Sequence, residues 1–192
     1  MYQTLRTCCV LFTVICGGGL PGLATVAQAA GSADTTINFS ATLVGGSCKV
    51  AVDNKDITFD PVSSAAVIAA GENGIDPRSF TLSFLGCNGW GLTPKIKISG
   101  TTITSGIPLF RTSDTESGYS QGYGVKLTQQ GENTAISDQS VITLGEKTAQ
   151  LNLLESKPLT FEARLSCGSC TPGTGLSGGN LKAAVTFQFL YE

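Results

Sequence analysis

Short runs of alternating apolar and polar residues dominate the chain from about residue 36 onward. A period of two is typical of β-strands with one buried and one exposed face, and little of the 3.6-residue helical period is found. The pattern predicts strands at residues 36–44, 48–52, 56–59, 79–87, 94–99, 124–128, 159–167 and 181–192, and a short helical turn within 63–70. Because turn residues separate these runs, the sequence predicts one compact all-β domain, an antiparallel sandwich or barrel.

Two of these runs have features of their own. The runs 48–52 and 56–59 are split by Asp53 and Asn54, and they are expected to form a pair closed by Asp60 and Pro61. The last run, 181–192, ends the sequence. It places four apolar side chains on one face, namely Val185, Phe187, Phe189 and Tyr191. This apolar face and the strand edge beside it need a cover.

The first 29 residues predict a cleaved signal peptide. Arg6 gives a positive n-region, residues 8–16 are largely apolar, and Ala27 and Ala29 form an A-x-A cleavage site. A buried core helix is the alternative, but glycine and proline fill the second half of the segment. The sequence therefore predicts an exported protein whose mature chain begins at Ala30.

Composition removes several classes of function. The chain has 12 Lys and Arg against 14 Asp and Glu, so it is not a basic nucleic-acid binder, and nothing predicts a nucleotide site. It contains no histidine, which excludes Ser-His-Asp and Cys-His catalysis and histidine-ligated metals. We expect no enzyme activity, no catalytic residues, no metal and no cofactor.

Four cysteines remain after signal removal: Cys48, Cys87, Cys167 and Cys170. An even number in an exported chain predicts disulfides, and four cysteines allow three pairings. We favour Cys48–Cys87 with Cys167–Cys170. A zinc site and a redox-active Cys-x-x-C are both disfavoured, the latter because the motif follows a strand and precedes a Pro172-Gly loop rather than a helix.

Two further residue groups leave alternatives open. Trp90, between glycines, is either an exposed binding aromatic or a side chain that packs in the core or caps the sandwich end, and we favour the second. Asp114 and Glu116 share a polar segment with Arg111. A pair of glycosidase carboxylates needs an enclosing cleft, so a solvated loop is the preferred interpretation.

Several motifs, taken in order, resemble the pilin subunits of type 1-like chaperone–usher fimbriae in Gram-negative bacteria. Tyr191 is the penultimate residue and Gly179 lies fourteenth from the end, two C-terminal marks of that family. The segments that carry the rest of the resemblance are 39–50, 80–87 and 122–128. The spacing of Cys48 and Cys87 also suits that family's disulfide. The resemblance covers essentially the whole mature chain.

The resemblance implies an incomplete immunoglobulin-like β-sandwich that lacks its final strand and is completed by donor-strand complementation. Residues 30–44 would be an N-terminal donor-strand extension and 45–192 the pilin domain. The implied donor side chains are Thr35, Ile37, Phe39, Ala41 and Leu43. The implied chaperone and acceptor groove residues are Gly179, Val185, Phe187, Phe189, Tyr191 and Glu192. From residues alone, 36–44 fits a strand of the protein's own sheet equally well, and the resemblance favours the donor role.

The implied partners are a periplasmic pilus chaperone, an outer-membrane usher and neighbouring pilin subunits, on a route through the periplasm to a cell-surface fimbrium. The implied function is that of a structural fimbrial subunit supporting cell adhesion. Ala41, where many family members carry glycine, and the extra Cys167–Cys170 pair favour a minor or specialised subunit. The alternative is an adhesive, receptor-binding tip subunit of the same system.

Overall fold

The structure is a computed structural model that describes residues 40–41, 45–112, 118–147, 150–173 and 175–192. The chain divides into two units, Met1–Ala41 and Thr42–Glu192, and the account below concerns the second. The predicted signal peptide and the donor residues Thr35, Ile37, Phe39 and Leu43 lie outside the described residues. Among the described residues, no helix has the length and apolar character needed to span a membrane.

Nine strands and three short helical segments are found among the described residues of this unit. The strands are β1 (Gly46–Val52), β2 (Ile75–Gly89), β3 (Pro94–Ser99), β4 (Thr102–Ser105), β5 (Ile107–Phe110), β6 (Gly124–Gln129), β7 (Ser140–Thr143), β8 (Leu159–Ser166) and β9 (Thr186–Tyr191). The helical segments are α1 (Ser64–Ala70) and the 3-10 turns η1 (Gly71–Asn73) and η2 (Leu151–Ser156). The predicted helical turn within 63–70 is therefore present, and the Ser63 side chain caps it by accepting from Ala66 N.

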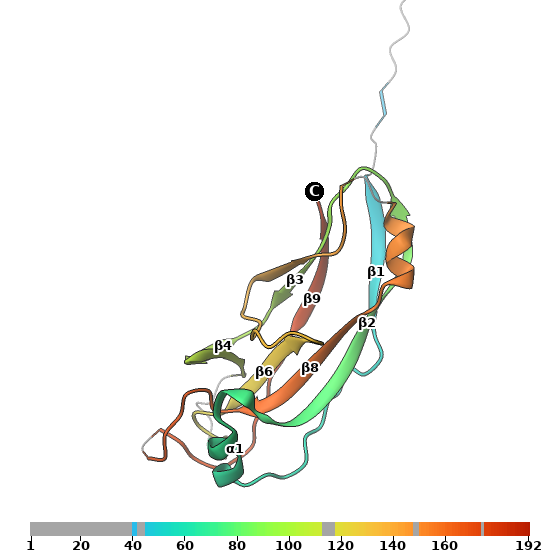
Figure 1. Cartoon of the computed structure of the whole chain (residues 1–192). Helices are drawn as coiled ribbons and strands as arrows, with labels where there is room; N and C mark the ends of the chain where they lie inside the picture. Colours follow the sequence, from blue (N-terminus) through green and yellow to red (C-terminus); the bar gives the residue numbers. More distant parts are fainter. Residues whose placement is uncertain (1–39, 42–44, 113–117, 148–149, 174) are drawn as a thin grey trace, which may run out of the picture. The chain divides into compact units, whose positions relative to one another are not determined.

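The strands form two antiparallel sheets (Figure 1). The larger has the order β1-β2-β8-β6-β5-β4 and the smaller β7-β3-β9. Side chains from both sheets meet in one core, so the sheets pack face to face as a sandwich. The prediction of an all-β, immunoglobulin-like sandwich is confirmed.

Alternation along the strands supplies this core. In β2 the inward residues Phe80, Leu82 and Phe84 are buried, and in β3 Ile96 and Ile98 are fully buried between outward polar neighbours. The rings of Phe80 and Phe187 approach to 5.8 Å between centroids, and those of Phe84 and Phe189 to 6.3 Å. These contacts join the two sheets, and burial of such side chains stabilises each by roughly 1.5–3 kcal/mol.

The prediction of a strand at residues 56–59 paired with 48–52 is wrong. β1 pairs instead with β2, from Gly46 opposite Gly89 to Val52 opposite Leu82. Asp53 ends this ladder, because its carboxylate accepts from Thr81 N at 2.9 Å while its own N–H donates to Thr81 O. Ile57 and Phe59 still pack against the core, but their backbone belongs to no strand.

Three strands were missed and one was predicted too long. β4, β5 and β7 have only four residues each, too few for a clear period. β9 begins at Thr186 rather than residue 181, because its partner β3 ends at Ser99, opposite Thr186. Before that point the backbone bonds elsewhere, for example Thr112 N to Lys182 O at 2.7 Å.

Candidate strand-accepting groove

A large groove lies between the C-terminal segment and the segment that follows β1. Its volume is about 1100 Å³. The floor is formed by side chains of the larger sheet, including Phe80, Leu127 and Ala163. One wall comes from residues 52–62 and the other from residues 178–187. The groove therefore opens directly onto the apolar core of the sandwich.

Both strands beside the groove are edge strands. β9 pairs with β3 over its whole length, from Thr186 opposite Ser99 to Tyr191 opposite Pro94. Among the described residues no strand pairs with its other edge, and β1 likewise has a partner, β2, on one side alone. In such an edge, alternate backbone N–H and C=O groups point away from the existing partner. They are available to hydrogen-bond an added strand.

The predicted groove residues do not all lie in the groove. Val185 and Phe187 line it, and the ring of Phe187 also lies 5.1 Å from that of Phe161. Phe189 packs against the core beyond the groove. The Tyr191 ring lies 6.2 Å from the Phe189 ring, measured between centroids, but Tyr191 remains 40% exposed. The apolar face of β9 is therefore divided between the groove and the closed part of the sandwich.

Gly179 lines the groove, and close backbone packing requires glycine at this position. Its φ is +151°, and a Cβ there would lie 2.7 Å from Gly118 O, Ser120 N and Tyr119 C. The loop is held by Ser120 N donating to Asn180 O at 2.8 Å and Asn180 N donating to Gly118 O at 2.9 Å. This glycine lets the groove wall approach the 118–120 segment, which no larger residue allows without displacing backbone.

Glu192 lies outside the groove, at the end of β9. Its side chain forms an ion pair with Lys95 Nζ at 2.6 Å, and its backbone exchanges hydrogen bonds with Thr93. These contacts hold the last residue against the start of β3. The side-chain carboxylate of Glu192 thus has a partner within the domain.

The wall formed by residues 52–62 is fixed to β2 by charged groups. Arg78 donates to the Asp60 carboxylate at 2.7 Å and pairs with Asp76 at 2.9 Å, while Asp60 N donates to Asp76. Hydrogen bonds with Asp76 and then Asp60 raise the pKa of Arg78 above its ordinary value. Arg78 therefore remains charged at any working pH. Its ion pairs hold the wall to β2 without a ladder of backbone hydrogen bonds between strands.

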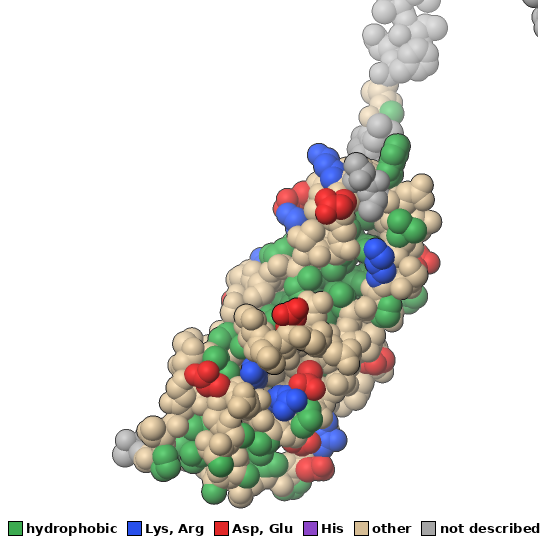
Figure 2. Space-filling model, viewed as in Figure 1, with side chains coloured by type: hydrophobic (Ala, Val, Ile, Leu, Met, Phe, Trp, Pro, Cys, Tyr) green, Lys and Arg blue, Asp and Glu red, His purple; other side chains and the backbone are tan. Residues whose placement is uncertain are grey.

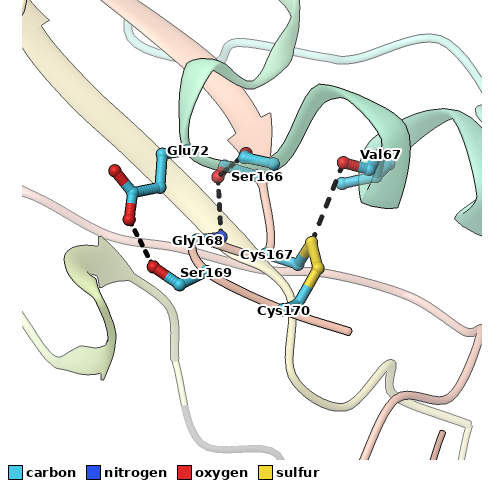
Figure 3. Close-up of a disulfide and its surroundings, with 8 residues drawn as sticks. Val67, Glu72, Ser166, Cys167, Gly168, Ser169 and Cys170 are labelled. Carbon is cyan, nitrogen blue, oxygen red and sulfur yellow. Dashed lines mark hydrogen bonds between the residues drawn. A yellow bond between two sulfur atoms is a disulfide. The ribbon is translucent and has the colours of Figure 1, made fainter. Parts of the chain in front are cut away.

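The other end of the groove is built on a second, smaller cluster: buried Val67, Tyr123 and Cys167 with Ile68, Ile75, Cys170 and Leu176 around them. Val67 of α1 and Tyr123 also line the groove. Figure 3 shows the Cys167–Cys170 disulfide beneath α1, with Cys167 Sγ 3.7 Å from the Val67 carbonyl oxygen. A disulfide sulfur carries no proton, so this is a packing contact. The disulfide thus supports the residue that forms the groove end.

Polar contacts hold the same loop from three sides (Figure 3). Ser166 Oγ donates to Gly71 O at 2.7 Å and accepts from Gly168 N at 2.9 Å. The Ser169 hydroxyl donates to Glu72, and Ser169 N donates to Ser105 O. Cys167 is fully buried. A reactive thiol needs access and a stabilised thiolate, so the geometry fits a structural loop better than a redox centre.

Cys48 and Cys87 form the other disulfide, which joins β1 to β2 across 39 residues of sequence. Both sulfurs contact the larger core. Cys87 N also donates to Glu155 Oε1 at 2.8 Å, which ties the end of β2 to η2. This bridge holds β1, one border of the open side of the sandwich, to the sheet that forms the groove floor.

Two expectations about single residues are wrong. Arg111, expected in a polar loop, is 2% exposed and donates to the carbonyls of Tyr123 at 2.8 Å and Ser120 at 2.6 Å. Trp90, expected to pack in the core or cap the sandwich end, is 73% exposed. Asp114 and Glu116 lie outside the described residues.

Sequence reasoning also missed some groove residues. The sequence predicts Ile57 and Phe59 in a strand and Thr112 in a polar loop, and it predicts no role for Ser120, yet all four line the groove. Ile57 and Phe59 carried an apolar signal that was assigned to the wrong element. Thr112 and Ser120 gave no signal, because their place depends on the approach of residues 178–182.

Comparisons with known proteins give one line of similarity. No family model matches the sequence, and no curated protein matches it. Among solved structures, the chain is similar to the crystal structure of the P pilus rod subunit PapA. The match has 17% sequence identity and a TM-score of 0.49, and it covers 82% of this chain and 100% of that chain. The described residues themselves form an all-β sandwich of two antiparallel sheets, with an open groove beside the last strand.

Proposed function

We propose that this protein is a structural subunit of a fimbria assembled by the chaperone–usher pathway. The observation that carries the proposal is the edge of β9 with which no strand of the described residues pairs, beside a groove that reaches the core. An extended segment added there gains main-chain hydrogen bonds from the edge, and its alternate side chains enter the groove. The activity is strand exchange between folded proteins and requires no chemical step.

The donor in the fibre is residues 30–44 of a neighbouring subunit. In the sequence, Ile37, Phe39 and Leu43 alternate with polar Asn38, Ser40 and Thr42. This is the pattern of a strand with one face in an apolar groove and the other in water. Thr35 and Ala41 complete the inward face, with Ala41 at the position that tolerates the least bulk.

Before assembly, a periplasmic chaperone occupies the groove with a strand of its own and holds the α-carboxylate of Glu192. At an outer-membrane usher, the incoming extension displaces it. The exchange proceeds because the final complex is more stable than the chaperone complex. The additional Cys167–Cys170 loop at the groove end favours a minor or specialised subunit with a modified groove.

A synthetic peptide of residues 30–44 tests the proposal directly. Added in excess to the full exported chain, it should fill the groove and block self-assembly measured by light scattering. A peptide with Ile37→Ser and Phe39→Ser should lose this effect, because its inward face no longer fits the groove. The matched control, Asn38→Ala and Ser40→Ala, changes the outward face and should retain it. Equal activity of the two variants would refute the donor register.

Deleting residues 30–43 gives a second test. The truncated protein should still accept the peptide and bind a chaperone, but it should fail to donate a strand to a neighbour. Continued polymerisation of the truncated chain would show that another segment is the donor.

A further inference from the structure

Hydrophobic side chains reach the surface at several places (Figure 2), and the large exposed ones on the described part of the domain are unevenly placed. Six of them have more than a third of their surface exposed to solvent: Val62, Leu85, Trp90, Val141, Leu153 and Tyr191. Leu85, Trp90 and Leu153 come from the second half of β2, the residue after it, and η2, which packs on β2. Trp90 is the largest of the six and the most exposed, at 73%. An exposed apolar group of this size is a marker of an interaction surface.

The backbone of Trp90 is held on both sides. Gly89, the preceding residue, pairs with Gly46 at the start of β1, and Trp90 itself forms an antiparallel bridge with Gln150. Gln150 is the N-cap of η2. The indole is therefore presented to solvent from a fixed backbone rather than from a loose loop.

Trp90 also lies where the N-terminal extension joins the domain. A Cβ on Gly89 would lie 2.6 Å from Gly45 O, and one on Gly46 would lie 2.8 Å from Leu151 Cδ1. Figure 1 shows the start of β1 and the orange turns of η2 side by side at this end. Gly89, which precedes Trp90, and Leu151, which follows its bridge partner Gln150, therefore lie beside the point at which residue 45 enters the first strand.

Chain length then limits how far away the acceptor of the extension lies. The last proposed donor residue, Leu43, is three residues before Gly46, and three residues of extended chain span at most about 11 Å. The subunit whose groove holds Leu43 is therefore within this distance of Gly46. Paired antiparallel Cα atoms lie roughly 5 Å apart and consecutive Cα atoms 3.8 Å, so Trp90 is also within about 9 Å of Gly46.

We propose that Trp90, together with exposed Leu153 of η2, which packs on β2, forms a contact surface for a second copy of this chain, the one whose groove receives residues 30–44. This inference rests on the proposed function. The surface adds a direct contact between domains to the strand joint, and it orients one subunit on the next. Buried aromatic side chains of this kind contribute strongly to protein interfaces.

The chain contains a single tryptophan, so its own fluorescence reports on this surface. We expect the emission maximum of the full chain to shift to shorter wavelength when it assembles. Full chain capped with excess peptide 30–44 should remain monomeric and show no shift, because the peptide fills the groove but carries no domain. Assembly without a shift would overturn the inference, as would a shift in the capped monomer.

Substitution gives an independent measurement. Trp90→Ser should raise the concentration needed for half-assembly roughly tenfold, the effect of losing one central interface side chain. The control is Val141→Ser. Val141 is 52% exposed and lies in β7, which forms the edge of the small sheet opposite β9. This variant should change that concentration less than about threefold. Equal effects of the two variants would overturn the inference.

The outcomes separate the inference from the function on which it rests. If the peptide binds but the full chain does not self-assemble, the second copy is the wrong occupant and the groove assignment stands. If the peptide fails to bind, the proposed function fails. If galactose, mannose or N-acetylglucosamine shifts the emission of the monomer while assembly does not, Trp90 belongs to a carbohydrate site and the inference is wrong.

Discussion

The two hydrophobic clusters of the domain differ in what they hold together. The larger joins both sheets, draws residues from β2, β3, β6 and β8, and includes Cys87. The smaller packs α1 and Leu176 around Tyr123 and Cys167 at one end of the groove. Each cluster contains one disulfide, yet one bridge spans 39 residues and the other three.

This difference indicates that stability and groove shape are controlled in separate places. The larger cluster buries several aromatic rings and closes the longer covalent loop, so it dominates the free energy of unfolding. The smaller cluster is local in sequence and supports the residues that line the groove end. The following variants test this division of roles.

Phe161→Ala should have the largest effect on stability. Phe161 is fully buried, with the Phe80 ring at 5.6 Å and the Phe187 ring at 5.1 Å. Its loss should lower the free energy of unfolding by about 3–5 kcal/mol, measured by urea denaturation. Val67→Ala in the smaller cluster should cost about 2 kcal/mol, because far fewer buried carbon atoms are removed than with the Phe161 ring.

The order should reverse for affinity. Val67 lines the groove and Phe161 does not. In buffer without denaturant, under conditions in which both variants are folded, Val67→Ala should therefore weaken binding of peptide 30–44 more than Phe161→Ala does. If the two variants rank alike in stability and in peptide binding, the clusters do not have separate roles.

Removing the two disulfides should give unequal losses of stability. By the chain-entropy relation, replacing Cys48 and Cys87 with alanine should cost about 4 kcal/mol, and replacing Cys167 and Cys170 about 2 kcal/mol. Thermal unfolding of the two double variants measures the difference. A larger loss from the Cys167–Cys170 pair would show that the smaller cluster, rather than the sandwich core, limits stability.

Gly179→Ala should have a moderate effect at the groove wall. The new Cβ would lie 2.7 Å from three backbone atoms, so the 118–120 segment must move, at a cost of about 1–3 kcal/mol. Gly178→Ala is the matched control, because nothing lies within 4 Å of a Cβ there. Its stability should stay within about 0.5 kcal/mol of the original. Similar losses from both would mean that the loop adapts and that close approach is unimportant.

The smallest effect is expected at Asp138, which contacts neither groove wall. Its carboxylate accepts from Gly100 N at 3.0 Å and from Gln139 Nε2 at 2.9 Å, and these bonds lower its pKa below the ordinary value. A lowered pKa stabilises the fold above the unfolded pKa of about 3.9, and this contribution is lost as pH falls through the folded value. Asp138→Asn should therefore reduce the loss of stability in acid. An unchanged acid dependence would show that the two hydrogen bonds contribute nothing measurable.

Much of the fold followed from the sequence because alternation and turns are local signals. β3 was predicted at its observed bounds, and β2, β6 and β8 were predicted within a few residues at most ends. The inward face of β8 was also correct, because Phe161, Ala163 and Leu165 are all buried. The prediction for residues 56–59 is wrong because Asp53 and Asn54 have the composition of a turn between paired strands, whereas Asp53 ends the ladder of β1 with β2. Whether a run pairs depends on a partner elsewhere in the chain, and β1 pairs with β2 rather than with residues 56–59.

The candidate site was less predictable. Val185 and Phe187 reach the groove as expected from the apolar face of the last strand, but Phe189 and Tyr191 do not. All four residues follow the same alternation along the chain, so only the position of the larger sheet decides which of them line the groove. Residue type also failed to predict burial at Arg111 and Trp90. The charged side chain of Arg111 is buried among backbone carbonyls, and the indole of Trp90 is exposed.

The sequence alone predicted an export signal, and it determined the all-β class, the strand faces and the type of protein that the chain resembles, because each depends on local order and residue identity. Only the tertiary structure decided which edges remain unpaired, which apolar residues line a groove, and which disulfide supports which cluster. These depend on sheet order and on contacts between segments far apart in the chain. No local pattern specifies that the edge of β9 faces the open side of the sandwich or that Trp90 follows the residue paired with the start of β1.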